Sequence, residues 1–510
     1  MFSNSLPSVL IRGSSALLAV GLALPLTANR VAAQPVPIVI DSAKPLCSSF
    51  LGFGVQWSPY PWYDISDKAW QRIYDRLDYM RVPVVRVMTR DYTYCEGFDP
   101  QGHPIYAWDN GHMKKLYRLL DYCESRHVKV ILGLWDDPAS PEDRPNDGSD
   151  RLQKYHIDCI DPRWPELVCD FISHLTHEKG YTCLRFFNLI NEPNGKWSHC
   201  GDFERWRTAV TNMSIEMKKR GLDKTMRLIG PDATGEKSYF WLDRAVIDTS
   251  AIIGAYDLHD YVGAEDLESG HEEMVLSEKR NFIDRYDPKG RGKPFFMGEI
   301  GMNHRGPVSP QGGEDSHPKV YEEIYGVWMT DFSIQAARAG MAGAIAWDLD
   351  DAMHIVKTRD NGWPDLHKTL FKKWGFFNSL AEEIGHPEDA NLRPWFFTWA
   401  LMARSFPPGC QTLESSNSGL PGLRTLAASN NDDVSIALVN DSDKENEVLL
   451  RSPGWASIKP LLKYSYTKQP RRVDSHGYPL PDAQISNPDY KTGLDLVLPA
   501  RSVLILTTIR

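Results

Sequence analysis

The chain has 510 residues, of which 42% are hydrophobic and 24% charged, and its formal net charge is −10. This length exceeds one ordinary domain and fits a large barrel followed by a smaller module. The acidic balance argues against nucleic acid as a partner and against a polyanionic substrate bound by the bulk field. It still allows an acidic sugar that one local arginine holds.

The first 33 residues have the pattern of a secretory signal peptide. Arg12 precedes an apolar run at 16–26, and Val31-Ala32-Ala33 forms a small-residue cleavage site before Gln34. The apolar run is too short to span a bilayer comfortably, so we expect no membrane attachment after cleavage, with an uncleaved anchor as the alternative. The pattern therefore predicts a secreted or periplasmic protein.

Short β-rich runs alternate with helical stretches between residues 50 and 350, which is the pattern of a parallel sheet with helical crossovers. Trp70, Ile73 and Leu77, for example, form one apolar stripe at helical spacing. An open, doubly wound sheet is the alternative, but Gly52-Phe53-Gly54 lacks the third glycine of its nucleotide-binding turn. We therefore predict an α/β fold, a closed (β/α)8 TIM barrel. The predicted strands span residues 50–56, 82–88, 128–134, 184–190, 226–229, 255–259, 295–297 and 343–346.

After about residue 393 the pattern changes to period-2 strands separated by Asn, Asp, Gly and Pro turns, with no convincing helix. This pattern predicts an all-β sandwich at 394–510, with strands at 434–440, 447–450, 494–498 and 502–508. The segment 34–45 contains a short strand at 37–40 that we expect to join the sandwich. The barrel domain then spans 46–393.

Two of the predicted barrel strands end in a glutamate. Strand four runs into Asn191-Glu192-Pro193, and strand seven ends in Gly298-Glu299. Barrel active sites form at the carboxyl ends of the strands, where strands four and seven lie across the opening from each other. Two carboxyls facing over a cleft are what glycoside hydrolysis requires, one to protonate the leaving oxygen and one to attack or stabilise the anomeric carbon.

At these positions the sequence resembles glycoside hydrolase clan A, a large retaining group that includes the cellulase-like family 5 and the xylosidase- and iduronidase-like family 39. The resemblance covers the whole barrel and, through the trailing sandwich, nearly the whole remaining chain. It implies that Glu192 is the catalytic acid/base and Glu299 the nucleophile. The retaining mechanism further implies that the two carboxyls lie about 5–5.5 Å apart.

The resemblance extends to other strand ends. It implies that Asn191 hydrogen-bonds the sugar 2-hydroxyl in subsite −1 and that Arg86 lies beneath the nucleophile and holds it ionised. The segment His259-Asp260-Tyr261 matches the clan's His-x-Tyr pattern, whose tyrosine hydrogen-bonds the nucleophile. Trp347 matches the tryptophan that floors subsite −1.

Further candidates for sugar contact lie just past strands one, three and four, although ordinary loop packing explains each about as well. Among them we favour Trp135 and Asp136, because strand three opens directly into the cleft. The candidates are Trp57, Trp135, Asp136, Asn194 and Trp197. By contrast, the scattered histidines His103, His112, His127 and His354 are expected at the surface or in loops.

Other chemistries find little support. A metal-dependent barrel hydrolase needs His-x-His at strand one, where Gly54-Val55-Gln56 has none, and we find no Gly-x-Ser-x-Gly elbow and no phosphate-cradling loop. We expect no metal and no cofactor. All 8 cysteines follow the predicted signal peptide, and no Cys-x-x-Cys pair suggests zinc or redox chemistry. Export permits disulfides, but their connectivity cannot be read from the sequence.

The sequence therefore predicts a secreted retaining glycoside hydrolase whose partner is a poly- or oligosaccharide substrate. A transglycosylase that uses the same site and a non-catalytic carbohydrate-binding protein are the alternatives. The sugar, the linkage, exo or endo action and the oligomeric state stay open at this point.

Overall fold

Eight parallel strands close into a barrel in the computed structural model, which describes residues 34–139, 152–356, 365–455, 459–468 and 471–510. The predicted signal peptide at 1–33 lies outside these residues. The barrel closes where β11 pairs with β2, and this confirms the predicted TIM barrel. The barrel strands are β2 (Gly52–Gln56), β3 (Val84–Thr89), β6 (Lys129–Leu134), β7 (Leu184–Asn188), β8 (Arg227–Thr234), β9 (Ala255–Val262), β10 (Phe295–Met302) and β11 (Gly343–Ala346).

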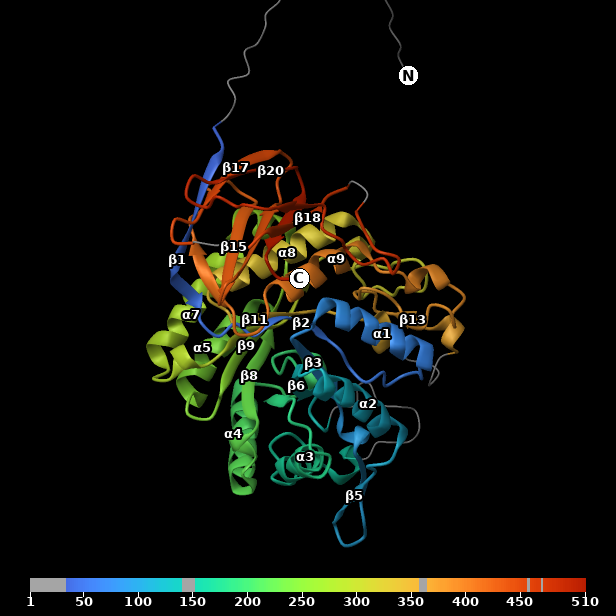
Figure 1. Ribbon diagram of the computed structural model, residues 1–510. Coiled ribbons are helices and arrows are strands. Elements are labelled where there is room, and N and C mark those ends of the chain that lie inside the picture. The colour runs from blue at the N-terminus through green and yellow to red at the C-terminus, as the bar shows by residue number, and fades with distance from the viewer. Residues whose placement is uncertain (1–33, 140–151, 357–364, 456–458, 469–470) are drawn as a thin grey trace, which may run out of the picture. The chain divides into compact units, whose positions relative to one another are not determined.

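Helices follow the barrel strands and lie outside them (Figure 1). The side chains of Ser66, Asn110 and Asp202 each accept a backbone N–H in the first turn of α1, α2 and α4, which explains where these three helices begin. The helices are α1 (Asp67–Met80), α2 (Gly111–Ser125), α3 (Arg163–Ser173), α4 (Phe203–Arg220), α5 (Ser238–Thr249), α6 (Ala264–Ser269), α7 (His271–Tyr286), α8 (Glu323–Arg338) and α9 (Pro394–Ser405).

A cluster of buried apolar side chains fills the barrel interior on the side away from the carboxyl ends of the strands. It takes residues from most of the barrel strands, including Val84, Phe186 and Phe296. Because side chains alternate along a strand, residues two positions further on, such as Arg86, point to the same side. The apolar cluster therefore supports the polar side chains above it, at the carboxyl ends of the strands.

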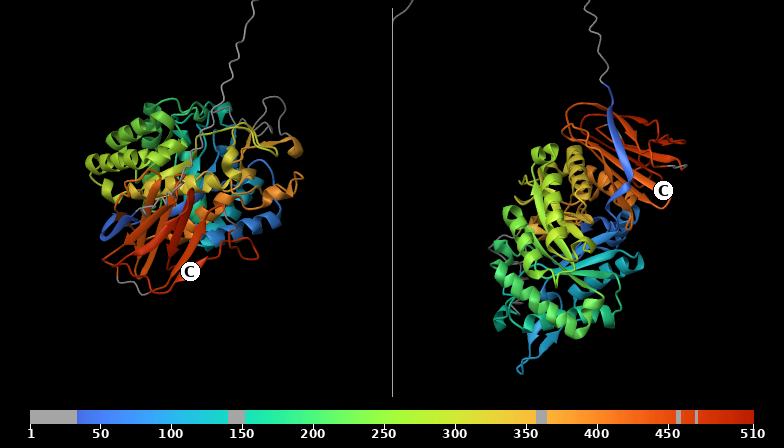
Figure 2. Two further views of the ribbon diagram at one scale, coloured as in Figure 1. Left: turned by 90° about the horizontal axis from the view of Figure 1, so that it is seen from above. Right: turned by 90° about the vertical axis from the view of Figure 1, so that its left-hand side faces the viewer.

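The C-terminal part forms a β domain of nine strands whose order is β19-β18-β21-β16-β15-β14-β1-β17-β20. β1 (Val36–Cys47) pairs antiparallel with β14 and parallel with β17, and its register shifts between Asp41 and Pro45, where the sheet curls. Figure 2 shows this N-terminal strand, in blue, beside the orange and red strands. The other strands are β14 (Gln411–Ser415), β15 (Leu423–Asn430), β16 (Asp433–Asn440), β17 (Asn446–Arg451), β18 (Leu461–Tyr466), β19 (Ala483–Ile485), β20 (Leu494–Leu498) and β21 (Ser502–Thr507).

The expectation of no helix after residue 393 is wrong, because α9 precedes the β strands. Pro394 occupies the first turn of this helix, a position where its missing N–H costs nothing. Almost every side chain of α9 is buried, including Trp395 and Trp399, so the helix lacks the polar stripe that marks an amphipathic helix in a sequence. The Trp399 indole donates to the carbonyl of Gly54 on β2 at 3.0 Å, and α9 therefore packs as a barrel helix.

Two short β pairs complete the fold, β4 (Cys95–Phe98) with β5 (Pro104–Tyr106) and β12 (Ile355–Val356) with β13 (Leu370–Phe371). All eight cysteines lie in the described residues as free thiols, and seven of them are buried. Among the described residues, no helix combines the length and apolar character that a membrane crossing requires.

Candidate active site

A cavity of about 480 Å³ opens at the carboxyl ends of the barrel strands. Its lining joins both predicted catalytic glutamates to aromatic and charged side chains from the loops that follow the strands. The lining consists of Ser58, Pro61, Trp62, Arg90, Trp135, Asp136, Asn191, Glu192, Trp197, Thr234, Tyr261, Glu299, Arg305, Asp315, Trp347, Met353, His354, Ile355, Val356, Lys372 and Trp374.

Glu192 lies in the tight turn that follows β7. Its backbone has φ of 44°, a left-handed conformation that residues other than glycine adopt only where the surrounding structure holds them firmly. The backbone N–H of Glu192 donates to the Asp232 carbonyl at 3.0 Å, and its own carbonyl accepts from Gly195 at 2.7 Å. Its side chain contacts His259, whose Nδ1 lies 3.0 Å from Oε1. The turn therefore holds this carboxyl at the cavity wall from several directions.

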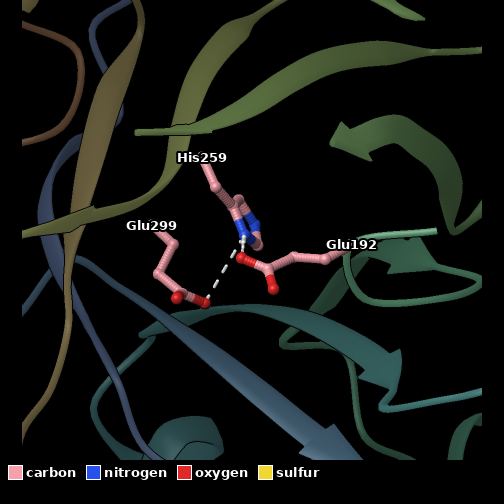
Figure 3. Close-up of side chains that lie close together, drawn as sticks. All are labelled: Glu192, His259 and Glu299. Carbon is pink, nitrogen blue, oxygen red and sulfur yellow. Dashed lines mark hydrogen bonds and ion pairs between the residues drawn. The ribbon is translucent and has the colours of Figure 1, made fainter. Parts of the chain in front are cut away.

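Glu299 lies on β10 where the register with β9 shifts, between Met297 and Glu299. A bulge of this kind changes the direction of the side chains around it, and here the Glu299 carboxyl enters the cavity. The Tyr261 hydroxyl donates to its Oε1, and Arg86 donates to its Oε2 at 3.1 Å. One carboxyl oxygen of Glu299 lies within 4.8 Å of one of Glu192, and the His259 imidazole faces both carboxyls (Figure 3).

Arg86 is fully buried and lies behind the glutamates, outside the cavity lining. Its two terminal nitrogens reach four acceptors. Nη1 donates to Gln56 at 3.0 Å and to Glu299, while Nη2 donates to Asn191 at 2.6 Å and to Asp232 at 2.8 Å. The guanidinium therefore fixes the Glu299 carboxylate and the Asn191 amide in one rigid arrangement.

Burial raises the pKa of the Glu299 carboxyl above its ordinary value, and the nearby Glu192 adds to this effect, while His259, Arg86 and Tyr261 oppose it. For His259, burial and the neighbouring carboxylates shift the pKa in opposite directions. Burial lowers it, but Asp232 and Glu299 outweigh burial and raise it to about 10. The imidazole beside the two glutamates is therefore a cation at neutral pH.

Asp232 is a functional residue that the sequence did not indicate. It lies on β8, is buried, and has φ of 58°. Burial alone raises the pKa of this carboxyl, but Arg86 and His259 outweigh burial and hold the pKa below its ordinary value. The only sequence signal is Gly230-Pro231 before it, which reads as the end of a strand.

Aromatic rings form one side of the cavity. The His354 imidazole stacks on Trp347 with ring centroids 4.6 Å apart, and Trp135 meets both rings edge-on at 5.5 Å and 6.0 Å. Trp374 packs edge-on against Tyr261 at 5.5 Å. Aromatic rings of this kind commonly form the apolar walls of small-molecule binding sites.

His354 lies in a loop, as expected, and its imidazole also lines the cavity, which the sequence did not indicate. Trp62, Arg90, Arg305, Asp315, Lys372 and Trp374 also line it and were not singled out in the sequence. Arg90 directly follows β3 and the other five lie in loops after the strands, none of them within a recognisable motif.

The structure places the five additional candidates in different environments. Trp135, Asp136 and Trp197 line the cavity, with Asp136 3.6 Å from the Arg90 Nε and Trp197 49% exposed at the rim. Asn194 and Trp57, by contrast, lie outside the lining.

Two physical reasons exclude Asn194 and Trp57 from that lining. The Asn194 amide is used by the backbone of Thr234, to whose carbonyl it donates at 2.7 Å and from whose N–H it accepts at 3.0 Å. The Trp57 indole is fully buried in the helix layer, where it packs on Trp70 and Tyr122. The expectation that these two residues contact sugar is therefore corrected.

Within the described part of the chain, one group of side chains is close enough to hold a metal ion, namely Glu192, His259 and Glu299. In the structure both ring nitrogens of His259 face carboxylates, Nε2 toward Asp232 and Nδ1 toward Glu192. An imidazole that donates from both nitrogens has no lone pair left for a cation.

The cavity and its glutamates can be compared with known proteins. The family model described as Cellulase (glycosyl hydrolase family 5) matches residues 47–352. No protein of curated function matches the sequence.

Solved structures of similar fold include a GH30 endoxylanase from Clostridium papyrosolvens C71, with a TM-score of 0.59 and 13% identity over 93% of this chain and 100% of that one. A GH39 β-xylosidase from Caulobacter crescentus has a TM-score of 0.58 and 14% identity over 92% and 99% of the two chains. SrfJ from Salmonella typhimurium has a TM-score of 0.60 and 14% identity over 94% of each chain. Identities this low show a shared fold, whereas the family model spans more than half of the sequence. The chain therefore belongs to the cellulase family, glycosyl hydrolase family 5, and is a glycosidase whose substrate is a carbohydrate.

Proposed function

We propose that this glycosidase is a secreted enzyme that cleaves an O-glycosidic bond of a poly- or oligosaccharide by double displacement, with retention of anomeric configuration. The observation that carries the proposal is the separation of the two carboxyls, whose nearest oxygens lie within 4.8 Å. Retaining enzymes have carboxyl groups about 5–5.5 Å apart, whereas inverting enzymes need about 6.5–9.5 Å to hold a water molecule.

In the first displacement Glu299 is the nucleophile. Its carboxylate oxygen forms a bond to the anomeric carbon while the bond to the leaving oxygen breaks, and Glu192 as an acid gives its proton to that oxygen. Arg86 and Tyr261, both bonded to Glu299, favour its carboxylate form and aim its oxygens.

In the second displacement Glu192 acts as the base. It takes a proton from water as the water oxygen bonds to the anomeric carbon, and the ester to Glu299 breaks, which restores both side chains. Once Glu299 is esterified its negative charge is gone, and with it the repulsion that a negative charge on Glu192 would meet.

The same geometry supports roles for the substrate-binding side chains. The Asn191 oxygen accepts from Arg86, which leaves the amino group of its amide for a sugar hydroxyl in the cavity. Trp347 and Trp135 offer ring faces beside the glutamates, and Trp197 offers one at the rim. A substrate sugar with a free 2-hydroxyl fits this arrangement.

The test begins with a panel of 4-nitrophenyl glycosides and polysaccharides, with the first-formed product anomer followed by NMR. Glu299→Ala should nearly abolish turnover. Glu192→Ala should lower it by about 10²–10⁴-fold on natural substrates, and azide should restore part of the activity on an activated aryl glycoside. Glu272→Gln, a change at a buried glutamate outside the cavity, is the matched control and should keep wild-type turnover.

Several outcomes would overturn the proposal. Wild-type activity in Glu299→Ala would show that Glu299 is not the nucleophile. A first product of inverted configuration would exclude double displacement. Binding of glycan without product release would favour a non-catalytic carbohydrate-binding protein. Transfer to an added sugar that outcompetes water would favour a transglycosylase.

Export is part of the proposal and rests on the signal-peptide pattern at residues 1–33. Expression of the full-length chain in a bacterial host should yield protein in the periplasm or medium whose N-terminal residue is Gln34. Full-length protein that stays in the cytoplasm or membrane fraction would contradict export and leave the catalytic assignment untouched.

A further inference from the structure

Asp232 contacts Arg86 and His259, two of the side chains that reach the catalytic glutamates, and the main chain of Glu192. Its Oδ2 accepts from Arg86 at 2.8 Å, and its Oδ1 lies 2.8 Å from Nε2 of His259. Its main-chain carbonyl accepts the Glu192 N–H, while its own N–H donates to Asp257 at 2.8 Å. The residue lies at a register shift in β8, between Pro231 and Ala233, and this bulge directs its carboxylate inward.

Both nitrogens of the His259 ring are within reach of carboxylates. Nε2 faces Asp232, while Nδ1 lies 3.0 Å from Glu192 and 3.6 Å from Glu299 (Figure 3). A neutral imidazole carries one N–H and donates on one side only, whereas the imidazolium donates on both. The imidazolium therefore makes an attractive contact with every carboxylate around the ring, whereas a neutral ring leaves one nitrogen without a proton toward a carboxylate.

We propose that Asp232 is a positioning residue that keeps His259 doubly protonated, so that the Nδ1–H remains available to whichever glutamate carries the negative charge. This inference rests on the proposed double displacement. Before the first step the ionised carboxyl is Glu299, and in the glycosyl-enzyme it is Glu192. The His259 Nδ1 lies within 3.6 Å of both carboxyls, so its proton is attracted to a charge on either one without a large movement of the ring.

Charge balance explains why an aspartate is needed. The buried cluster holds two cations, Arg86 and His259, and two anions, Asp232 and one of the two glutamates. This balance is the same before and after the first displacement, because one glutamate loses its charge as the other gains it. Without Asp232 the cluster has one cation in excess, and the imidazolium, unlike the guanidinium, can release a proton.

The remaining groups around His259 supply a control. Asp257 lies two residues earlier on β9, and burial followed by the neighbouring Asp232 raises the pKa of its carboxyl well above the ordinary value. Tyr261 follows on the same strand and donates to Glu299. Asp257→Asn changes a carboxyl whose raised pKa disfavours its charged form, whereas Asp232→Asn removes the carboxylate that contacts Arg86 and His259. Asparagine tolerates the left-handed backbone at position 232, so neither change strains the chain.

The decisive measurement is the titration of the His259 imidazole by NMR in the wild type, Asp232→Asn and Asp257→Asn. We expect the wild type and Asp257→Asn to keep both ring protons through pH 8 and Asp232→Asn to lose one near neutral pH. If the imidazole pKa in Asp232→Asn falls to the ordinary value of about 6.5, roughly one molecule in 30 keeps the second proton at pH 8. The kcat/KM of this variant should then fall about 30-fold between pH 5 and pH 8 beyond any change in the wild type.

Asp232→Glu, which keeps the charge, should restore part of the high-pH activity. The proposal is overturned if His259 titrates alike in Asp232→Asn and the wild type, or if the wild-type ring carries a single proton at neutral pH, an observation that needs no variant to fold. The NMR titration does not depend on turnover. An active Glu299→Ala enzyme would therefore refute the proposed function separately.

Discussion

Removal of the Tyr261 hydroxyl should change the rates of the two displacement steps to different extents. In Tyr261→Phe the Glu299 carboxylate loses a buried donor. A hydrogen bond to a charged group contributes about 1.5–3 kcal/mol, which corresponds to about 10- to 150-fold in rate. In the second displacement Glu299 regains its negative charge as the ester breaks, so the missing donor slows this step by up to that factor.

The first displacement responds differently, because there the negative charge leaves Glu299. At a pH where Glu299 is ionised, kcat/KM should therefore fall much less than the rate of the second step. The donor also lowers the pKa of Glu299, so its loss raises this pKa further. The acid limb of the kcat/KM profile, where activity disappears as the pH falls and Glu299 takes up a proton, should move to higher pH.

Pre-steady-state kinetics on an activated aryl glycoside measure both steps. The variant should show a burst of phenolate followed by a slow steady state as the glycosyl-enzyme accumulates. Tyr256→Phe is the matched control, since Tyr256 lies on the same strand and its hydroxyl donates to the Asp287 carboxylate at 2.7 Å, away from the cavity. That change should lower the unfolding free energy by about 1.5–3 kcal/mol and leave kcat unaltered. Equal losses in kcat and kcat/KM for Tyr261→Phe, without a burst, would refute the reasoning.

Three further changes test other parts of the structure. Arg86→Lys keeps the charge, but an ammonium has three donors for the four acceptors of Arg86, so at least one charge-assisted hydrogen bond is lost and kcat/KM should fall at least about 10-fold while circular dichroism stays unchanged. Asp389→Ala leaves Lys373 and Arg393 buried without their shared carboxylate and should cost about 3–5 kcal/mol in urea unfolding. Burial acts to raise the pKa of Asp389, but Arg393 and Lys373 lower it to about 2, so its contribution to stability is present above the ordinary carboxyl range and disappears as the pH falls toward 2. Trp197→Ala should raise KM for longer oligosaccharides by about 2- to 10-fold and spare small aryl glycosides, and equal effects on both substrates would contradict a rim contact.

The barrel strands could be predicted because each is a local pattern of β-rich residues between helices. The positions of the two glutamates followed from the order of those strands, since residues at the carboxyl ends of strands four and seven face the same opening. The structure brings Glu192 and Glu299 to one cavity, as that order predicts. Helix α9 could not be predicted in the same way, because a helix buried on nearly all sides shows no polar stripe.

Asp232 illustrates a second limit. The predicted strand ends at residue 229, directly before Gly230-Pro231, a pair that usually terminates a strand. In the structure β8 continues to Thr234 through a bulge, and the bulge brings the aspartate under the glutamates. Whether a glycine-proline pair ends a strand or bends it depends on pairing with neighbouring strands, which are distant in the sequence.

Trp57 shows that strand register, more than position at a strand end, decides which side chains reach the cavity. Gln56 pairs in register with Arg86 on β3, and its side chain accepts from that arginine inside the barrel. Because side chains alternate along a strand, an inward Gln56 turns Trp57 outward into the helix layer. Trp135, at the end of β6, reaches the cavity instead. An assignment of Arg86 to the barrel interior, combined with the pairing of β2 and β3, is thus enough to exclude Trp57, and the same alternation applied strand by strand would sharpen the selection of cavity residues in related barrels.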